Sequence, residues 1–112
     1  MRIYKNYRGD VVRERYKIPS LVTVYLMQVG YSDIYKIGHT SKDVSERVGS
    51  IRFYVKNIKL ISQTYCSVIV ERELHKFFKE KNVHFNGFRE YFKLTDFEVN
   101  FIIKYFKEVN HG

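Results

Sequence analysis

The sequence predicts an α+β fold in which a small antiparallel sheet of three or more strands is flanked by helices. Three observations favour this class. Apolar, β-branched segments occur in succession and are separated by short turns, as in hairpins. Segments with apolar residues at helical spacing follow them, and each starts at a residue suited to capping. With 112 residues, the chain is long enough for one domain with one core.

Residues 1–20 are expected to form a basic arm or an extra strand in front of the main domain, which spans residues 21–112. The arm has six basic and two acidic side chains, so it carries +4 of the chain's net charge of +8. Basic and apolar residues alternate over Val12–Ile18, as in a half-buried strand, until Pro19 interrupts the pattern. The residues of the arm expected to contact nucleic acid are Arg2, Lys5, Arg8, Arg13, Arg15 and Lys17.

The main domain begins with a predicted antiparallel hairpin. Leu21–Val29 and Ile34–Thr40 are the two strands, and Gly30–Asp33 has the composition of a turn. Asp43, with Glu46 three residues later, predicts the start of a short helix. Its apolar stripe consists of Val44, Val48 and Ile51.

A third strand of mixed burial and a second helix follow. Asn57–Tyr65 has the strand pattern, Ser67 is a candidate cap, and the helix is expected to end at Lys79–Lys81. The helical stripe consists of Val70, Leu74, Phe77 and Phe78.

The end of the chain predicts a loop, a short strand and a last helix. His84–Arg89 is the loop and Glu90–Leu94 the extended piece. Thr95 and Glu98 have the spacing of a capping box. The apolar side of this helix is expected to contain Phe97, Phe101, Ile102, Tyr105 and Phe106.

Charge and composition limit the function. A net charge of +8 and a pI near 9.6 favour a polyanionic partner, nucleic acid first, over a generically basic protein. The single cysteine excludes an internal disulfide, and no Cys and His pairs have zinc-site spacing. No apolar run has the length of a membrane span, and the N-terminus lacks the apolar stretch of a signal peptide. We therefore expect a cytoplasmic protein.

Five segments carry a more specific signal. They are Val24-Tyr25-Leu26, Tyr35-Lys36-Ile37-Gly38-His39-Thr40, Asp43-Val44-Ser45-Glu46-Arg47, Glu71-Arg72-Glu73-Leu74-His75-Lys76-Phe77-Phe78 and Arg89-Glu90-Tyr91-Phe92-Lys93-Leu94. In this order they resemble the GIY-YIG nuclease superfamily, and more closely its small phage-associated branch with a YKIG-type strand and an ExxLHxxF helix. The resemblance covers residues 22–100. It implies a metal-dependent endonuclease that hydrolyses phosphodiester bonds of DNA, which is favoured over RNA, with one Mg²⁺ or Mn²⁺.

The resemblance also assigns roles to side chains. It implies that Glu71 holds the metal, that Arg47 clamps the phosphate, and that Tyr25 is the general base. Tyr35 would position phosphate or water, and we expect it to face Tyr25 across the hairpin. His39 is a rival base whose ordinary pKa lies nearer neutral pH.

Other residues are expected to support the site. His75 lies four residues after Glu71 and is expected to hydrogen-bond to it. Gly38 is expected to allow close approach of the backbone, and Lys36 and Lys42 to contact nucleic acid. Tyr91 and Phe92 should close the core, while Glu73 should be exposed. Two asparagines, Asn82 and Asn86, match the superfamily's asparagine only imperfectly.

Two other functions are compatible with the sequence. A catalytically inactive nucleic-acid-binding module would keep the fold and the basic arm without turnover. A small protein-interaction domain with an aromatic surface fits the charge less well and ranks last. Without an appended reading domain, specificity would come from a homodimer, a protein partner or the shape of the substrate.

Overall fold

The computed structural model describes residues 2–5, 11–14, 21–85 and 87–111. Within the arm, β1 (Arg2–Lys5) pairs with β2 (Val11–Glu14) in antiparallel orientation. Residues 12–14 of the expected strand Val12–Ile18 lie in β2, and residues 15–18 lie outside the described residues. The main domain contains β3 (Leu21–Val29), β4 (Ile34–Thr40), α1 (Val44–Ile51), β5 (Ile58–Ser67), α2 (Ile69–Phe77), the 3₁₀ helix η1 (Lys79–Lys81), β6 (Asn82–Phe85), β7 (Phe88–Lys93) and α3 (Asp96–Val109).

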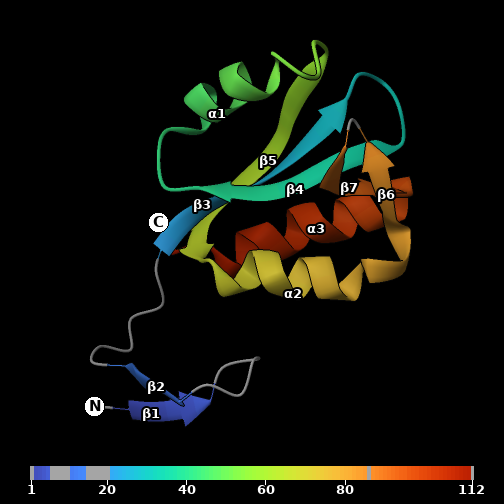
Figure 1. The fold of residues 1–112 in the computed structure, drawn as a ribbon. Helices are drawn as coiled ribbons and strands as arrows, with labels where there is room; N and C mark the ends of the chain where they lie inside the picture. The colour runs from blue at the N-terminus through green and yellow to red at the C-terminus, as the bar shows by residue number, and fades with distance from the viewer. Residues whose placement is uncertain (1, 6–10, 15–20, 86, 112) are drawn as a thin grey trace.

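The main sheet has five strands in the order β5-β3-β4-β7-β6, and all neighbours are antiparallel (Figure 1). This confirms the predicted α+β class. In the hairpin β3–β4, Tyr25 lies opposite Gly38 and Leu26 lies opposite Ile37. The register of β3 with β5 shifts between Leu26 and Met27, which places a bulge in the middle of the sheet.

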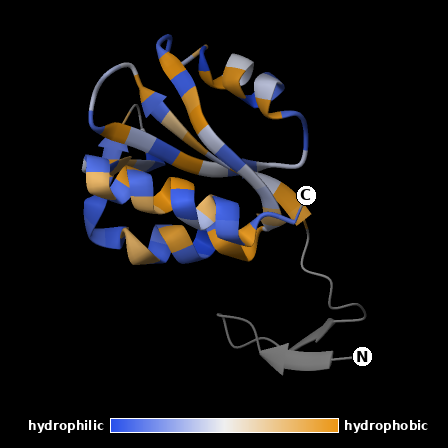
Figure 2. Ribbon diagram, turned by 180° about the vertical axis from the view of Figure 1, so that it is seen from behind, coloured by the Kyte–Doolittle hydropathy of each residue, from blue (hydrophilic) through white to orange (hydrophobic). Residues whose placement is uncertain are grey.

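Helices cover both faces of the sheet, α1 on one side and α2 with α3 on the other (Figure 1). The expected single core is therefore divided by the sheet into two clusters of buried side chains. The larger cluster joins the sheet to α2 and α3 and includes Leu26, Ile102 and Phe106. The smaller cluster lies on the α1 side and includes Met27 and Ile51. Figure 2 shows hydrophobic and hydrophilic residues alternating along these elements, as layered packing requires.

The helix starts follow the predicted capping residues. The Asp43 carboxylate accepts a hydrogen bond from the Ser45 N–H at α1. At α3, Thr95 and Glu98 form the reciprocal capping box. At α2 the capping position is Val68, one residue later than expected, although the Ser67 hydroxyl accepts a 3.2 Å hydrogen bond from the Ile69 N–H.

The predicted loop at residues 84–89 is wrong, because β6 and β7 form a hairpin there. The dipeptide Asn86-Gly87 is a strong hairpin signal that the loop prediction did not use. Gly87 has φ = 78°, a left-handed conformation suited to glycine.

Three predicted core aromatics are also placed differently. Phe77, Phe97 and Phe101 are exposed, with Phe97 at 81%. The rings of Phe77 and Phe101 stack on each other, with their centres 5.7 Å apart. In α3 the buried positions are instead Val99, Ile102 and Phe106. Tyr91 and Phe92 are buried as expected, one in each cluster. No helix within the described ranges is long and apolar enough to cross a membrane.

Candidate active site

The strands β4 and β7 separate at the end of the sheet that carries the predicted site. Their pairing stops at Lys36 and Tyr91, whereas β4 stays paired with β3 as far as Thr40. Beyond this point the Ile37 carbonyl accepts a 2.7 Å hydrogen bond from His75 Nε2 of α2. We call this opening between β4 and β7 the fork. Side chains from both faces of the sheet can meet there.

On the α1 face, Tyr25 and Arg47 are held together. The Tyr25 side chain is completely buried, and its hydroxyl accepts a 3.3 Å hydrogen bond from Arg47 Nε. A Cβ atom on Gly38 would lie 2.4 Å from this hydroxyl, so the glycine makes room for the phenol. The bond to Tyr25 raises the pKa of Arg47; burial opposes the shift, and the charges of Glu90 and Glu71 add to it. The guanidinium is therefore a fixed positive charge.

Lys36 and Glu90 form an ion pair across the fork. Lys36 is only 4% exposed, and its ammonium contacts Glu90 Oε2 and lies 5.4 Å from the centre of the Tyr91 ring. Burial alone would raise the pKa of Glu90, but the hydrogen bond and charge of Lys36, with smaller contributions from His75 and Arg47, lower it. Lys36 is thus a buried partner of a carboxylate and not the exposed nucleic-acid contact that we expected.

On the α2 face, Glu71 lies between two imidazoles. Its side chain is buried, its Oε2 contacts His39 Nδ1, and its Oε1 lies 3.6 Å from His75 Nε2. The expected hydrogen bond between His75 and Glu71 is replaced by this longer contact, because His75 Nε2 donates to the Ile37 carbonyl. The His75 ring also packs edge-on against Phe92, 5.1 Å away. His75 therefore ties α2 to β4 behind Glu71.

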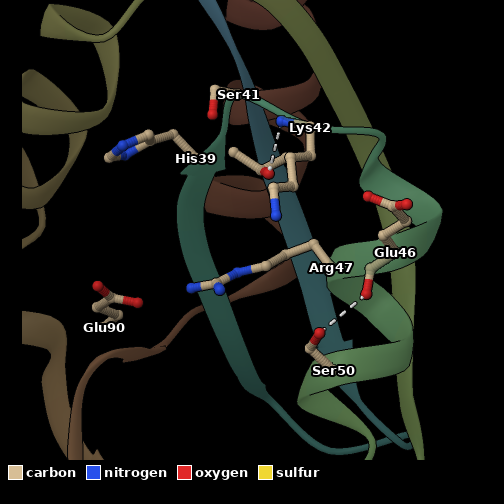
Figure 3. Close-up of a pocket in the computed structure, with 8 residues that line it drawn as sticks. His39, Ser41, Lys42, Glu46, Arg47, Ser50 and Glu90 are labelled. Carbon is tan, nitrogen blue, oxygen red and sulfur yellow. Dashed lines mark hydrogen bonds between the residues drawn. The ribbon is translucent and has the colours of Figure 1, made fainter.

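Of these groups, His39, Arg47 and Glu90 line a hollow of about 790 Å³ at the fork, which we call the main hollow (Figure 3). Tyr25, Lys36, Glu71 and His75 do not line it. It is lined by His39, Thr40, Ser41, Lys42, Glu46, Arg47, Ser50 and Glu90. In Figure 3 the Arg47 side chain points from α1 toward the side where His39 and Glu90 lie, and Lys42 points inward from the loop after β4. Three cationic or basic groups and two carboxylates therefore share one concave surface.

Tyr35 does not face Tyr25, and that prediction is wrong. Tyr35 lies opposite Gln28, and it stands three positions before Gly38, the partner of Tyr25. Because side chains alternate along a strand, this odd offset places the two tyrosines on opposite faces of the sheet. Tyr35 packs in the larger cluster, where burial, with Asp96 and Asp33, raises its pKa. Lys36, the next residue of β4, lies on the Tyr25 face of the sheet instead.

The comparison with protein-family models gives one match, the T5orf172 domain, over residues 22–109. The chain belongs to the T5orf172 domain family. This is a phage-associated domain related to GIY-YIG and HNH-like nuclease families, and it is associated with nuclease-like function and nucleic-acid interaction. No curated protein and no solved structure matches the chain.

Within this T5orf172 domain, Glu90 is the site residue that sequence reasoning missed. It was part of a matched segment, but only the aromatic residues after it were considered. The signal available in the sequence was its place in that segment, directly before the aromatic pair Tyr91-Phe92. Tyr91 itself is an unsuitable base, because burial, with Tyr25 and Glu90, raises its pKa to about 12.

Other predicted residues lie away from the main hollow or outside the description. Arg2 and Lys5 are in β1 and Arg13 is in β2, whereas Arg8, Arg15, Lys17 and Asn86 lie outside the described residues. Asn82 has a structural role, since its amide donates to the carbonyls of Arg89 and Tyr91. Glu73 is exposed on α2, as expected.

The donor set around the fork fits a divalent ion that keeps most of its water. Glu71 supplies hard carboxylate oxygens of the kind that Mg²⁺ and Mn²⁺ bind, and Glu90 is a second carboxylate, on the wall of the main hollow. In the part of the chain that the structure describes, no three His, Cys, Asp or Glu side chains are grouped to enclose a metal ion. These residues therefore fit a hydrated ion and not a caged one.

Proposed function

We propose that this protein is a GIY-YIG-type endonuclease that hydrolyses phosphodiester bonds of DNA with one Mg²⁺ or Mn²⁺. The observation that supports this is that His39 and Arg47 line one hollow at the fork, with Glu71 in contact with His39 and the Tyr25 hydroxyl bonded to Arg47. Phosphodiester hydrolysis needs a positive clamp, a base and a carboxylate for a cation, and each has a candidate there.

Arg47 would bind the phosphate to be cleaved. Its Nε is engaged by Tyr25, so the two terminal nitrogens remain to donate to the phosphoryl oxygens. Negative charge grows on these oxygens as water attacks, and a donor fixed in advance stabilises it without rearrangement. Tyr25 is then a positioning residue that sets the direction of the guanidinium.

His39 is the favoured general base. With Nδ1 protonated and donating to Glu71, its Nε2 has the lone pair needed to take a proton from water. The His39 side chain is 44% exposed and lines the main hollow, whereas the Tyr25 ring is completely buried. The water oxygen would bond to phosphorus, its proton would pass to His39, and the phosphorus–oxygen bond to the 3′ oxygen would break. Solvent would protonate the departing oxygen.

Glu71 would hold the divalent ion through an oxygen, and Glu90 is the second carboxylate at the fork. When bound, such an ion offsets negative charge on the phosphoryl group and the leaving oxygen. The assignment of Glu71 as the metal ligand follows the family's nuclease relatives and the chemistry of its oxygens. In the protein itself, His39 contacts Glu71, and the Lys36 ammonium balances the charge of Glu90.

A nicking assay tests the proposal. Supercoiled plasmid should be nicked in Mn²⁺ and left intact in EDTA, and Glu71→Gln or Arg47→Ala should slow nicking by at least about 100-fold. Glu73→Gln is the matched control, because Glu73 is an exposed carboxylate on the same helix. Full activity in either site variant would remove this mechanism.

A second candidate is a binding module without turnover. It is favoured by the burial of Glu71 between two imidazoles, and by the presence of Lys36 and not Tyr35 on the Tyr25 face of the sheet. Such a protein would bind DNA less tightly as salt increases and would cut none of the substrates. Single-stranded, duplex, branched and RNA substrates should all be included, so that an unusual substrate is not mistaken for inactivity.

A further inference from the structure

We propose that a second hollow beside the main one binds an unpaired nucleobase next to the scissile phosphate. This inference rests on the proposed function for the position of that phosphate. It adds a substrate class, DNA with an extruded or single-stranded nucleotide at the cleavage site.

The second hollow is continuous with the main one. It has a volume of about 430 Å³, within the range of sites that bind one small ligand, and it shares Arg47, Ser50 and Glu90 with the main hollow. A phosphate bound at Arg47 would therefore have this second space directly beside it. One nucleotide could place its phosphate in the first and its base in the second.

Aromatic rings form one wall of the second hollow. Tyr54, just after α1, and Phe88, at the start of β7, meet edge-to-face with their ring centres 5.6 Å apart. Both are more exposed than is usual for aromatic residues, since Tyr54 is 66% and Phe88 is 41% exposed. Two elements far apart in sequence thus present ring surface to the same space.

Charge distinguishes this wall from an ordinary apolar patch. Arg47 and Arg89 line the same hollow as the two rings. Aromatic faces beside a positive groove are the combination that proteins use to stack bases and track the backbone of single-stranded nucleic acid. An apolar protein segment would gain from the rings but would offer the guanidinium groups no anion.

The geometry also selects against a paired base. Both faces of a base in a continuous duplex are covered by its stacked neighbours, so neither face is open to the Tyr54 or Phe88 ring. A base in duplex DNA must leave the stack to enter it, and this costs least where the base is already unpaired. We therefore infer a preference for bulged, branched or single-stranded DNA over a continuous duplex.

Binding measurements with a fluorescent base test the inference. The full-length protein is titrated, in EDTA to prevent cleavage, against a duplex with 2-aminopurine in a one-nucleotide bulge and against the fully paired duplex. We expect tighter binding to the bulge and quenching of 2-aminopurine as it stacks on a ring. Tyr54→Leu and Phe88→Leu should each reduce the bulge preference about tenfold and weaken the quenching. Phe97→Leu is the matched control, since Phe97 is 81% exposed on α3 and does not line either hollow.

The outcomes separate this inference from the proposed function. Equal binding of bulged and paired DNA without quenching overturns the inference, even if the plasmid is nicked. Quenching that both leucine variants abolish supports it, even if no substrate is cut, and in that case only the nuclease proposal fails. Since the two variants change different elements, and circular dichroism reports their folding, a defect in one does not hide the result of the other.

Discussion

Among single residues at the site, Gly38 leaves the least room for a side chain. A methyl group there would come within 2.4 Å of the Tyr25 hydroxyl and 2.7 Å of the ring carbon that bears it. Both atoms belong to a completely buried side chain that cannot move freely. The absence of a side chain at position 38 thus keeps Tyr25 in contact with Arg47.

We expect Gly38→Ala to lower the free energy of unfolding by about 1–3 kcal/mol, because overpacking forces the buried phenol to shift. It should also slow nicking by displacing Arg47. Urea unfolding and the plasmid assay measure the two effects. Gly49→Ala in α1 is the control: no atom lies within 4 Å of its added Cβ, and alanine favours helix, so stability should increase by about 0.4–1 kcal/mol. Similar effects of the two substitutions would refute the steric argument.

Single residues also show what could be predicted at the site. Arg47 was predictable, since its helical position beside an apolar stripe directs it toward the sheet edge, and the structure places it in the main hollow. The position of Tyr35 was predicted wrongly, because the family pattern does not take into account that side chains alternate between the two faces along β4. Glu90 was missed because its pairing with Lys36 depends on two strands whose neighbourhood the sequence does not state. The spacing of a motif predicts where site residues lie along the chain, whereas the side chains that they contact depend on the order of the strands in the sheet.

At the scale of elements, the contact between Lys36 and Glu90 links β4 to β7 at the fork. The pKa of Glu90 in the folded protein lies below its ordinary value of 4.5. The stabilisation from its ionised form is therefore present above the pKa of the unfolded chain and is lost as pH falls through the lower, folded pKa. Stability at the fork should depend on pH in the acid range.

We expect Lys36→Met to destabilise the protein by about 1–3 kcal/mol at neutral pH, since it leaves a partly buried carboxylate without its partner. The loss should shrink as pH decreases below 4.5 and the carboxyl becomes neutral. Chemical unfolding at several pH values measures it. Lys93→Met is the control, because its 3.8 Å contact with Asp33 joins two exposed side chains and should contribute less than about 1 kcal/mol at any pH. A loss that is independent of pH would contradict the assignment.

The secondary structure elements were largely predictable from local signals. Asp43 and Thr95 mark helix starts through their own hydrogen bonds, and these need no tertiary partner. The hairpin β3–β4 follows from its apolar strands and turn. The strand β6 alternates regularly between exposed and partly buried residues, but it escaped prediction because four residues are too few to distinguish this pattern from a loop. A short edge strand such as β6 is stabilised mainly by its pairing with the neighbouring strand.

At the scale of the whole molecule, the distribution of positive charge determines where a polyanion is attracted. Around the fork, Lys36 and Arg47 lie close to Glu71 and Glu90, so the charges of these four groups balance. The excess positive charge of the chain lies elsewhere, and half of it is in residues 1–20. The arm should therefore contribute affinity without sequence specificity.

Replacing Arg2, Lys5 and Arg13 by glutamine should flatten the dependence of log K on log salt for a duplex by about 0.9 for each phosphate that the arm no longer neutralises. Fluorescence anisotropy between low and moderate salt gives the slope. The control removes the same charge from Lys76, Lys79 and Lys81, which are exposed on α2 and η1 and line neither of the two hollows. If both triple variants change the slope equally, net charge and not the arm is responsible.

The fork has a consequence for how this domain can evolve. Buried ionic groups lie where the ladder between β4 and β7 ends, so the proposed active site occupies a part of the sheet with fewer ladder bonds. Apolar replacements that tighten this region would increase stability and reduce turnover. Relatives in which the proposed nuclease activity is no longer selected should therefore change first toward a closed, more hydrophobic seam between β4 and β7.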